Sequence, residues 1–296
     1  MGYRNMTFFD EKMDKTILDD TLITGAQGMA GSYVDFGITT NKRSLDVTDL
    51  KEVMAVGKKY KPKVILHLAA ETDVDRCERD PEYAYRVNSI GTYNMGVMAK
   101  EVGAKLVYVS TAGVFDGKKK TPHNENDEPN PQNYYGRSKF LGELAVRGLL
   151  ENYIIVRVCW MMGGGPTKDQ KFVAKIIDQL KNQEIKEIRA VNDQIGSPTF
   201  AKDVIAAVKI LLQEGKKGIF HTANNGVISR YEVAKYIVEI LRPEVKVIPV
   251  ASSFFSLDAK RTENEGLTAK ENYMRPWKEA LREYLETEWK PFFEVK

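Results

Sequence analysis

Residues 21–31 read TLITGAQGMAG, a short apolar run followed at once by a turn that carries Gly25, Gly28 and Gly31. This G-x-x-G-x-x-G spacing is typical of a turn that leads from a strand into a helix. Glycines there give a tight turn, let the backbone approach a pyrophosphate and allow close helix packing, and phosphate charge is favoured at a helix N-terminus. Glycine turns also end strands for steric reasons alone, so the surroundings must decide.

Apolar runs and helical patterns alternate after this turn. Continuous apolar runs of the buried parallel-strand type cover residues 63–70, 105–110 and 153–158, and helical patterns lie between them near 48–60, 81–103 and 133–152. This alternation predicts an α/β fold with a doubly wound parallel (Rossmann) sheet. Because ligands of such sheets lie beyond the carboxyl ends of the strands, residues 25–31, 69–71 and 110–111 should line one crevice.

The rest of the chain predicts a small C-terminal α/β substrate lobe. Its expected elements are amphipathic helices at 170–183 and 201–213, a strand at 218–222, a helix near 230–241, a strand at 246–250 and a closing helix from Pro276. We assign residues 21–158 to a dinucleotide-binding domain to which 183–222 returns, and residues 159–182 and 223–296 to a substrate-binding lobe. Residues 1–20 are an N-terminal extension, either a short amphipathic helix or a docking arm.

The composition is that of an ordinary soluble protein. Lys+Arg 44 against Asp+Glu 41 leaves a net charge of +3, which argues against nucleic acid or a membrane surface as partner. No apolar run approaches the roughly 18 residues of a membrane span, and no secretory signal precedes the first strand. Two cysteines, Cys77 and Cys159, and three scattered histidines give no metal-ligand spacing. We therefore expect a cytoplasmic protein without a metal site.

The segment Tyr135-Gly136-Arg137-Ser138-Lys139 carries a phenol and an ammonium four residues apart. On a helix, positions i and i+4 lie on one face about one turn apart, so both groups should reach the same small volume. A nearby cation lowers the pKa of a phenol from its usual value of about 10. We therefore predict that Lys139 acidifies Tyr135, which can then protonate a carbonyl oxygen as hydride reaches the carbon.

The glycine turn, Ser110-Thr111 at the end of a central strand, and Tyr135 with Lys139 together resemble the extended short-chain dehydrogenase/reductase superfamily. Further motifs resemble the dTDP-4-dehydrorhamnose reductase family over residues from about 21 to 287. These motifs are 45–49 (LDVTD), 69–75 (AAETDVD), 110–117 (STAGVFDG), 157–160 (RVCW), 193–199 (DQIGSPT) and 218–221 (GIFH) leading into Tyr231-Glu232.

This resemblance implies roles for particular residues. Tyr135 is the proton donor, Lys139 holds the nicotinamide ribose, and Thr111 bonds the substrate carbonyl or the Tyr135 hydroxyl. The implied reaction is NAD(P)H-dependent reduction of the C4 ketone of a nucleotide-linked 6-deoxy sugar, as in dTDP-rhamnose biosynthesis. The residues implied on the substrate side are Trp160, Gln194, Ser197, Thr199 and Arg261, the last of them near the nucleotide diphosphate.

The same resemblance places the cofactor. The residues implied around the dinucleotide are Gly25, Gln27, Gly28, Met29, Asn41, Lys42, Arg43, Asp46, Val47, Ala69, Ala70 and Glu71, together with Tyr135 and Lys139. By bare distance from the glycine turn, Asp46 suits the acid that holds a ribose 2′-hydroxyl. Aligning residues 45–49 with the family motif instead puts Asn41-Lys42-Arg43 at the end of the second strand, where two cations favour a 2′-phosphate. We therefore predict NADPH over NADH.

Several positions that would face the sugar depart from the family pattern. Ala112-Gly113 replaces an acid and an aromatic residue, Glu71 stands where tyrosine or histidine is common, Gln170-Lys171 replaces paired asparagines, and Thr262 replaces a proline after Arg261. The hypothesis is a reductase for a related but different nucleotide sugar. The alternatives are an epimerase or dehydratase of the same fold that recycles tightly held NAD, and a non-catalytic, cofactor-binding regulatory subunit. A homodimer is the expected assembly.

Overall fold

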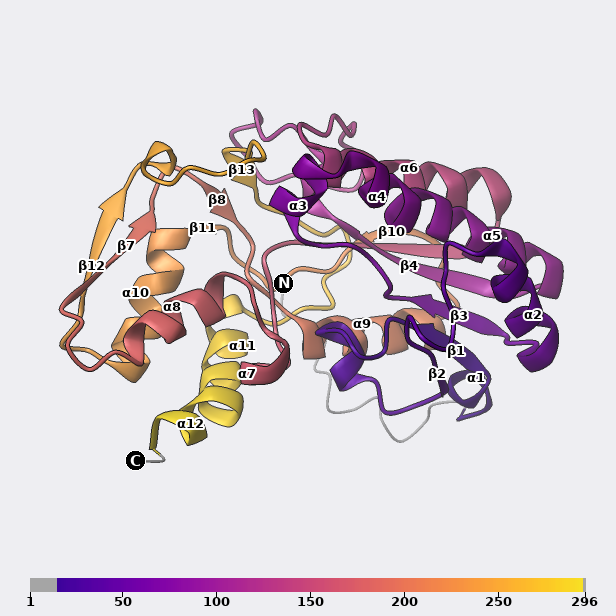
Figure 1. Cartoon of the computed structure of the whole chain (residues 1–296), viewed down its shortest axis with the longest axis horizontal. Coiled ribbons are helices and arrows are strands. Elements are labelled where there is room, and N and C mark those ends of the chain that lie inside the picture. The colour runs from indigo at the N-terminus through magenta and orange to yellow at the C-terminus, as the bar shows by residue number, and fades with distance from the viewer. Residues whose placement is uncertain (1–14, 295–296) are drawn as a thin grey trace.

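A six-stranded parallel sheet forms the centre of the molecule. The computed structural model describes residues 15–294, and the strand order of its main sheet is β10-β5-β4-β3-β1-β2 (Figure 1). These strands are β1 (Thr21–Thr24), β2 (Ile38–Thr39), β3 (Val64–His67), β4 (Lys105–Thr111), β5 (Tyr153–Val158) and β10 (Gly218–His221). The predicted doubly wound α/β class is confirmed. The chain reverses its direction of travel across the sheet between β1 and β3, where folds of this class bind ligands.

Helices cover both faces of this sheet. Leu22, Ile65 and Leu106 lie in one apolar cluster with residues of α2 (Leu50–Tyr60), α5 (Gly91–Val102) and α6 (Tyr134–Leu149). Their chain neighbours Ile23, Leu66 and Val107 lie in a second cluster with residues of α9 (Ala201–Gln213). Successive residues of a strand point to opposite faces. Both faces are therefore buried, which is why the strands are continuous apolar runs in the sequence.

The helical region predicted at 81–103 is three consecutive pieces. After α3 (Val74–Arg79) come α4 (Pro81–Tyr85), a π-helical turn η4 (Arg86–Ile90) and α5. The Asp80 carboxylate accepts a hydrogen bond from the amide of Tyr83 and so begins α4. The wide turn η4 carries Asn88, which is fully buried. Such π-turns occur frequently at functional sites.

The glycine turn does not lead into a full α-helix, as its spacing had predicted. It leads into η3 (Ala30–Tyr33), a single 3-10 turn, and then into the two-residue strand β2. Gly31 packs so closely on Ala26 that a Cβ would overlap the Ala26 carbonyl. A turn this short has little helix dipole. Any phosphate here must therefore be held by backbone amides and nearby side chains.

A second apolar core lies beside the main sheet and forms the smaller lobe. Around it pack α8 (Phe172–Leu180), α10 (Arg230–Leu241), α11 (Trp277–Tyr284) and the parallel pair β7 (Glu187–Val191) and β12 (Lys246–Val250). The smaller elements of the chain are η5 (Ala112–Val114), β6 (Met161–Met162), α7 (Gly165–Lys168), β9 (Thr199–Phe200), η6 (Ser252–Phe254), η7 (Leu285–Trp289) and α12 (Lys290–Glu294).

The strand β7 was not predicted, and it changes the expected return point of the chain. It lies within residues 183–222, which we had assigned to the dinucleotide-binding domain, yet it pairs with β12 of the smaller lobe. Of that segment, β10 pairs with β5 of the main sheet and α9 packs against a face of that sheet. Ile188 and Ala190 are buried while Glu187 and Arg189 are exposed. This alternation belongs to a half-buried sheet rather than to a central strand.

A three-stranded sheet joins distant parts of the chain next to the main sheet. Its order is β11 (Ile228–Ser229), β8 (Ile195–Gly196) and β13 (Asn264–Glu265).

At the N-terminus, α1 (Lys15–Asp19) lies within the extension predicted at residues 1–20. The part of that extension at residues 1–14 lies outside the described residues. Within residues 15–294, no helix combines the length and the apolar character needed to cross a lipid bilayer.

Candidate active site

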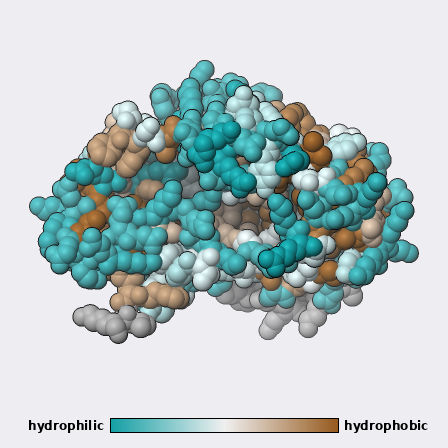
Figure 2. Space-filling model, in the orientation of Figure 1, coloured by the Kyte–Doolittle hydropathy of each residue, from teal (hydrophilic) through white to brown (hydrophobic). Residues whose placement is uncertain are grey.

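The glycine turn lies beside the segment that follows β3. The amide of Ala69 donates to the Thr24 hydroxyl at 3.2 Å, and that hydroxyl is 2.7 Å from Nδ1 of His67. The turn is also tied to the end of β2, because the amide of Ala26 donates to the Thr40 carbonyl at 3.1 Å. These bonds bring the ends of three strands together. The molecular surface is hollowed between the two lobes (Figure 2).

Gly25 is the residue on which this close approach depends. Its φ is +68°, and a Cβ would stand 2.6 Å from the amide nitrogen of Ala69 and 2.8 Å from its Cα. Gln27 and Gly28 are exposed at the tip of the turn, and Met29 is partly exposed. A cradle that only glycine can form, with backbone open at its tip, fits the pyrophosphate of a dinucleotide.

Replacing Gly25 with alanine is expected to lower the free energy of unfolding by about 2–3 kcal/mol, because the backbone is left-handed and the methyl group meets Ala69. Urea unfolding measures this change. Gly103→Ala is the matched control, since its φ is +72° and nothing lies within 4 Å of its Cβ position. We expect the control to lose about 1 kcal/mol. Equal losses in the two variants would show that the approach to Ala69 is unimportant.

The segment predicted to meet the adenosine ribose is a tight turn with cations around it. The side-chain oxygen of Asn41 accepts from the amide of Arg43 at 2.8 Å, and Lys42 and Arg43 are exposed. Oδ1 of Asp46 accepts from the amide and the hydroxyl of Thr48, and these hydrogen bonds lower the pKa of Asp46. Val47 is buried in the core.

Three cationic side chains surround the ring of Tyr83 at this end of the site. Arg76, Arg86 and Lys42 lie 4.4, 5.5 and 5.6 Å from its centroid. Lys42 and Arg86 also help to lower the pKa of Asp46, so they lie near the predicted ribose segment. Sequence reasoning found Lys42 but missed Arg76 and Arg86, which come from other elements. Their combined charge favours a 2′-phosphate over a 2′-hydroxyl.

The segment after β3 is fixed by Asn88, which sequence reasoning also missed. The Asn88 side chain accepts from the amide of Glu71 at 2.9 Å and donates to the Glu71 carbonyl and the Ser138 hydroxyl, both at 3.0 Å. It therefore ties residues 69–71 to helix α6. The Glu71 carboxylate pairs with Arg76 at 3.0 Å. A buried asparagine within an otherwise helical pattern was the available signal, because buried amides need partners.

Tyr135 and Lys139 lie in the first turns of α6. The side-chain oxygen of Asn133 accepts from the amide of Gly136 at 2.8 Å and begins the helix. Gly136 has no side chain where a Cβ would overlap the Gly113 carbonyl, and this brings Tyr135 against η5. Thr111 lies there too, with its hydroxyl accepting from the amide of Gly113 at 3.0 Å. The structure therefore brings Thr111 and Tyr135 together at the carboxyl end of β4.

The pKa values of Tyr135 and Lys139 differ from the expectation that Lys139 lowers the pKa of Tyr135. Burial raises the pKa of Tyr135 well above its usual value, the Thr111 hydroxyl acts in the opposite direction, and Lys139 is not among the principal causes. The reason lies with Lys139 itself. It is buried with its ammonium 4.2 Å from the ring centroid of Tyr108, and burial lowers its own pKa to about 7. The phenol therefore stays protonated at neutral pH.

Lys139 should make dinucleotide binding depend on pH. Its pKa is lowered to about 7, so the ammonium is present below that pH and is lost as the pH rises through it. If the ammonium holds the nicotinamide ribose, affinity should fall along the same curve. Dinucleotide affinity measured by fluorescence over roughly two pH units on either side checks this. Lys139→Arg keeps its charge throughout, so its affinity should not change near pH 7, and a decrease there would contradict the assignment.

A buried ion pair lies one turn further along α6. Glu143 accepts from Nε of Arg157 at 2.9 Å, from Nη2 at 2.6 Å and from the Ser110 hydroxyl at 2.6 Å. Glu143 and Arg157 are both completely buried. The pair joins α6, β4 and β5 directly behind Thr111 and Lys139, and Glu143 raises the pKa of Lys139 against the effect of burial. An arginine inside the apolar run of β5 was a signal that sequence reasoning did not use.

The residues expected to face the substrate divide into two groups. Ser197 and Thr199 are fully buried and satisfied within the chain: the Ser197 hydroxyl accepts from the amide of Leu267 at 3.1 Å, and Thr199 donates to the Ser197 carbonyl at 3.0 Å. They shape the loop rather than its surface. Trp160, Gln194 and Arg261 remain partly exposed. Arg261 is engaged, because it pairs with Asp75 at 2.8 Å and donates to the Ala259 carbonyl.

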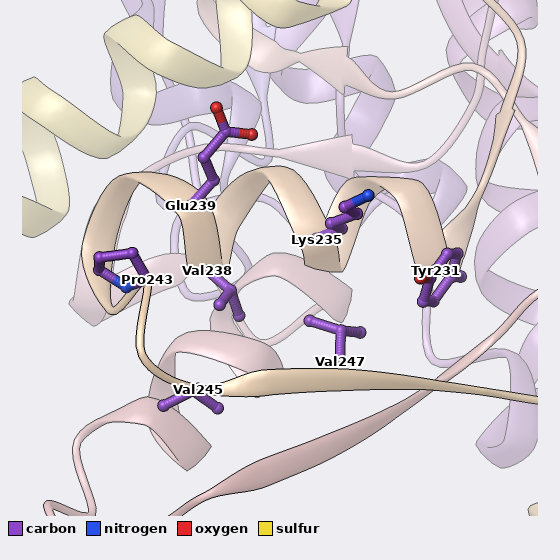
Figure 3. Close-up of a pocket in the computed structure, with 7 residues that line it drawn as sticks. All are labelled: Tyr231, Lys235, Val238, Glu239, Pro243, Val245 and Val247. Carbon is purple, nitrogen blue, oxygen red and sulfur yellow. The ribbon is translucent and has the colours of Figure 1, made fainter.

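One further feature of the surface, a groove in the smaller lobe, does not belong to this site. A groove of about 320 Å³ between α10 and β12 is lined by Tyr231, Lys235, Val238, Glu239, Pro243, Val245 and Val247 (Figure 3). It lies in the smaller lobe, and none of the residues expected at the site lines it. Among residues 15–294, no three His, Cys, Asp or Glu side chains are grouped so that they could hold a metal ion.

Known proteins are similar to this chain in sequence and in architecture. The family model described as "RmlD substrate binding domain" matches residues 20–289. The spore coat polysaccharide biosynthesis protein SpsK of Bacillus subtilis is 34% identical over 280 residues, covering 90% of this chain and 96% of that protein. The dTDP-4-dehydrorhamnose reductase of Mycobacterium tuberculosis (strain CDC 1551 / Oshkosh) is 33% identical over 283 residues, covering 88% and 90%. The Bacillus anthracis dTDP-4-dehydrorhamnose reductase, crystallised with NADP, superimposes with a TM-score of 0.84 at 34% identity, covering 90% and 98%.

Proposed function

This chain belongs to the RmlD substrate binding domain family, to which it is matched over residues 20–289, and on that premise we infer that it is a dTDP-4-dehydrorhamnose reductase-like oxidoreductase. It reduces the 4-keto group of a nucleotide-linked 6-deoxy sugar with NADPH. One observation carries this conclusion: Thr111 at the carboxyl end of β4 meets Tyr135 of α6, and Asn88 ties α6 to residues 69–71, against which the glycine turn packs. This is where a dinucleotide and a ketone must meet.

The site residues divide the work of the reaction. A nicotinamide held in this site would supply the hydride that reduces C4 of the sugar. Tyr135 donates its phenolic proton to the C4 oxygen. Burial raises the pKa of the phenol and so makes it a weaker acid, but the alkoxide that forms at C4 is a stronger base than a phenolate and can still take the proton. Thr111 orients the phenol or the ketone through its hydroxyl. Lys139 holds the nicotinamide ribose through its ammonium and, since its own pKa is near 7, does so best below neutral pH.

NADPH is the preferred cofactor. Lys42 and Arg86 lie beside Tyr83 next to the ribose segment, together with Arg76, which is paired with Glu71. A 2′-phosphate therefore meets positive charge beside the ribose segment. The relative from Bacillus anthracis was crystallised with NADP, which agrees with this preference. NADH is expected to serve as the cofactor less well than NADPH.

The sugar is proposed to differ from the one that dTDP-4-dehydrorhamnose reductases take. Ala112 and Gly113 are buried in η5 against Tyr135, so no acid or aromatic side chain reaches the sugar from this turn. Glu71 is paired with Arg76, and Lys171 donates to the Thr72 carbonyl at 2.7 Å. Both side chains are therefore engaged within the chain at positions where the family resemblance implies contact with the sugar. The partner in solution is a nucleotide sugar, and nucleic acid is not proposed.

Oxidation of NADPH followed by the absorbance of the reduced nicotinamide, with a panel of nucleotide-linked 4-keto sugars, tests this function. Turnover of one member is the expected result, and NADPH should give a higher kcat/KM than NADH. Epimerisation without net consumption of NADPH would support the epimerase alternative. Cofactor binding without turnover of any panel member would support a regulatory subunit.

The proposed assembly is a homodimer built on α5 and α6. Four large apolar side chains on these adjacent helices and the preceding turn are exposed: Ile90, Tyr93, Leu141 and Leu144. The elements that carry them pack on one another, and we propose that these side chains form one interaction surface for a second copy of the chain. Light scattering should give twice the mass of the chain, and replacing both Leu141 and Leu144 with Glu should give a monomer.

Both cysteines are free thiols, which is usual in a reducing compartment, and a cytoplasmic location is proposed on that ground.

A further inference from the structure

Trp160 has both faces of its indole ring covered by other groups of this chain. One face lies on Gly196: a Cβ there would stand 2.7 Å from Cδ2 and Cζ2 of the ring and closer still to Cε2 between them. Over the ring also lies the guanidinium of Arg230, whose carbon is 4.1 Å from the ring centroid. Because the backbone of Gly196 leaves no room on its own side, Arg230 covers the opposite face. A ligand at this position therefore meets Arg230 rather than the indole face.

Arg230 is held firmly in this orientation. It is the first residue of α10, whose N-terminus is fixed by reciprocal hydrogen bonds between Ser229 and Glu232. Ser229 also lies opposite Ile195 in the sheet formed by β11 and β8. The ring of Phe172 lies 5.0 Å from the same guanidinium carbon. A guanidinium packed between aromatic rings keeps its N–H groups in their common plane, directed away from the rings.

The charge of Arg230 is not compensated as that of its neighbour is. Arg261 forms an ion pair with Asp75, whereas no ion pair or hydrogen bond of Arg230 is seen among the described residues. Glu265 bonds the Trp160 indole N–H at 2.6 Å and lies beyond ion-pair distance of Arg230. Trp160 packs on the apolar cluster that contains Ala112 and Val114 of η5, the turn against which Tyr135 lies. Arg230 therefore lies in the same region as the proposed proton donor and brings positive charge to it.

We propose that Arg230 binds the diphosphate of the nucleotide-sugar substrate through its guanidinium, a role that rests on the proposed function. The diphosphate is the anionic group that every such substrate carries, and a rigid guanidinium suits its oxygens with paired hydrogen bonds. Arg261, which we had expected near the diphosphate, instead ties the loop at 259–261 to α3 through Asp75. Trp160, which we had expected on the substrate side, is covered by Arg230 at this position.

Calorimetric titration of dTDP and UDP into four proteins tests the proposal without turnover. These are the wild type, Arg230→Gln, Arg230→Lys and Arg147→Gln. Loss of charged hydrogen bonds should weaken nucleoside diphosphate binding by about 10- to 100-fold in Arg230→Gln. Arg230→Lys should lie between, because an ammonium keeps the charge but not the planar fork. Arg147 is exposed on α6, so Arg147→Gln should match the wild type, and NADPH affinity should be the same in all four.

Unchanged nucleoside diphosphate affinity in Arg230→Gln would overturn the proposal, as would a wild type that binds neither dTDP nor UDP. An altered KM for the nucleotide sugar with unaltered dTDP affinity would also overturn it, since the guanidinium would then act on the sugar. If Arg230→Gln does not fold, Arg230→Lys decides the question by the same titration. Failure of the proposed function is distinguishable, because it would leave binding intact while no 4-keto sugar is reduced.

Discussion

Replacing Tyr135 with phenylalanine is expected to lower kcat/KM by about 10²–10⁴-fold, the usual contribution of a positioned general acid. The substitution removes one oxygen from a ring that packs against Gly113 and Thr111, so the surrounding backbone has no reason to move. NADPH affinity and the midpoint of thermal unfolding should therefore stay at their wild-type values. Steady-state kinetics with the sugar that the panel identifies, together with a cofactor titration, measure both halves of this prediction.

Tyr134→Phe is the matched control. It removes the same oxygen from the preceding residue of α6, whose ring packs edge-on against Tyr85 and lies beside Arg137 instead of facing Thr111. Its kcat/KM should match that of the wild type. Tyr135→Phe with undiminished turnover would remove the phenol from the mechanism. A variant that lost NADPH affinity to the same extent as turnover would show that Tyr135 binds the cofactor rather than transfers a proton.

Replacing Arg157 with methionine is expected to lower the free energy of unfolding by about 3–5 kcal/mol, because it leaves the Glu143 carboxylate buried without its counter-ion. Glu143 is fully buried and would retain the Ser110 hydroxyl as a partner. Arg157 also lies 5.1 Å from the ring centroid of Phe115, so a flexible apolar chain can fill much of its space. Urea unfolding measures the loss.

Two further variants separate the charge effect from packing. Changing Glu143 to Leu together with Arg157 to Met removes both charges, and we expect it to recover most of the lost stability. Arg282 pairs with Glu286 on the surface of the smaller lobe, so Arg282→Met should change stability by less than about 1 kcal/mol. A single Arg157 variant as stable as the surface control would show that the buried pair contributes little.

The consequence of this pair for catalysis follows from its position. Glu143 is one helical turn beyond Lys139 on α6, and Ser110 precedes Thr111 on β4. The hydrogen bonds that Glu143 accepts from Ser110 and Arg157 therefore fix α6 and β4, the two elements that carry Tyr135 and Thr111. Precise placement of reacting groups accounts for a large share of enzymatic rate enhancement. Loss of the pair should reduce kcat as well as stability.

Local patterns in the sequence predicted the parallel sheet and the glycine turn, and they placed Tyr135 and Lys139 four residues apart on one helix. They did not predict that the Lys139 ammonium lies over the ring of Tyr108. A strand buried on both faces is mostly apolar, a dinucleotide turn needs glycine where the backbone closely approaches another segment, and residues four apart on a helix share a face. Each of these requirements lies within a few neighbouring residues. The dTDP-4-dehydrorhamnose reductase resemblance rested on the same short motifs, and the family match confirms it.

Only the tertiary structure decided which partners these residues meet. The reason is that hydrogen bonds, ion pairs and burial join residues far apart in the chain, and burial also sets the protonation of Tyr135 and Lys139. Asn88 reaches Ser138, Glu143 meets Arg157, Asp75 engages Arg261, and Arg230 covers Trp160. Thus the sequence by itself determined the architecture and the proposed chemical groups. The tertiary structure decided their charge and their contacts, since neither is a property of a short segment.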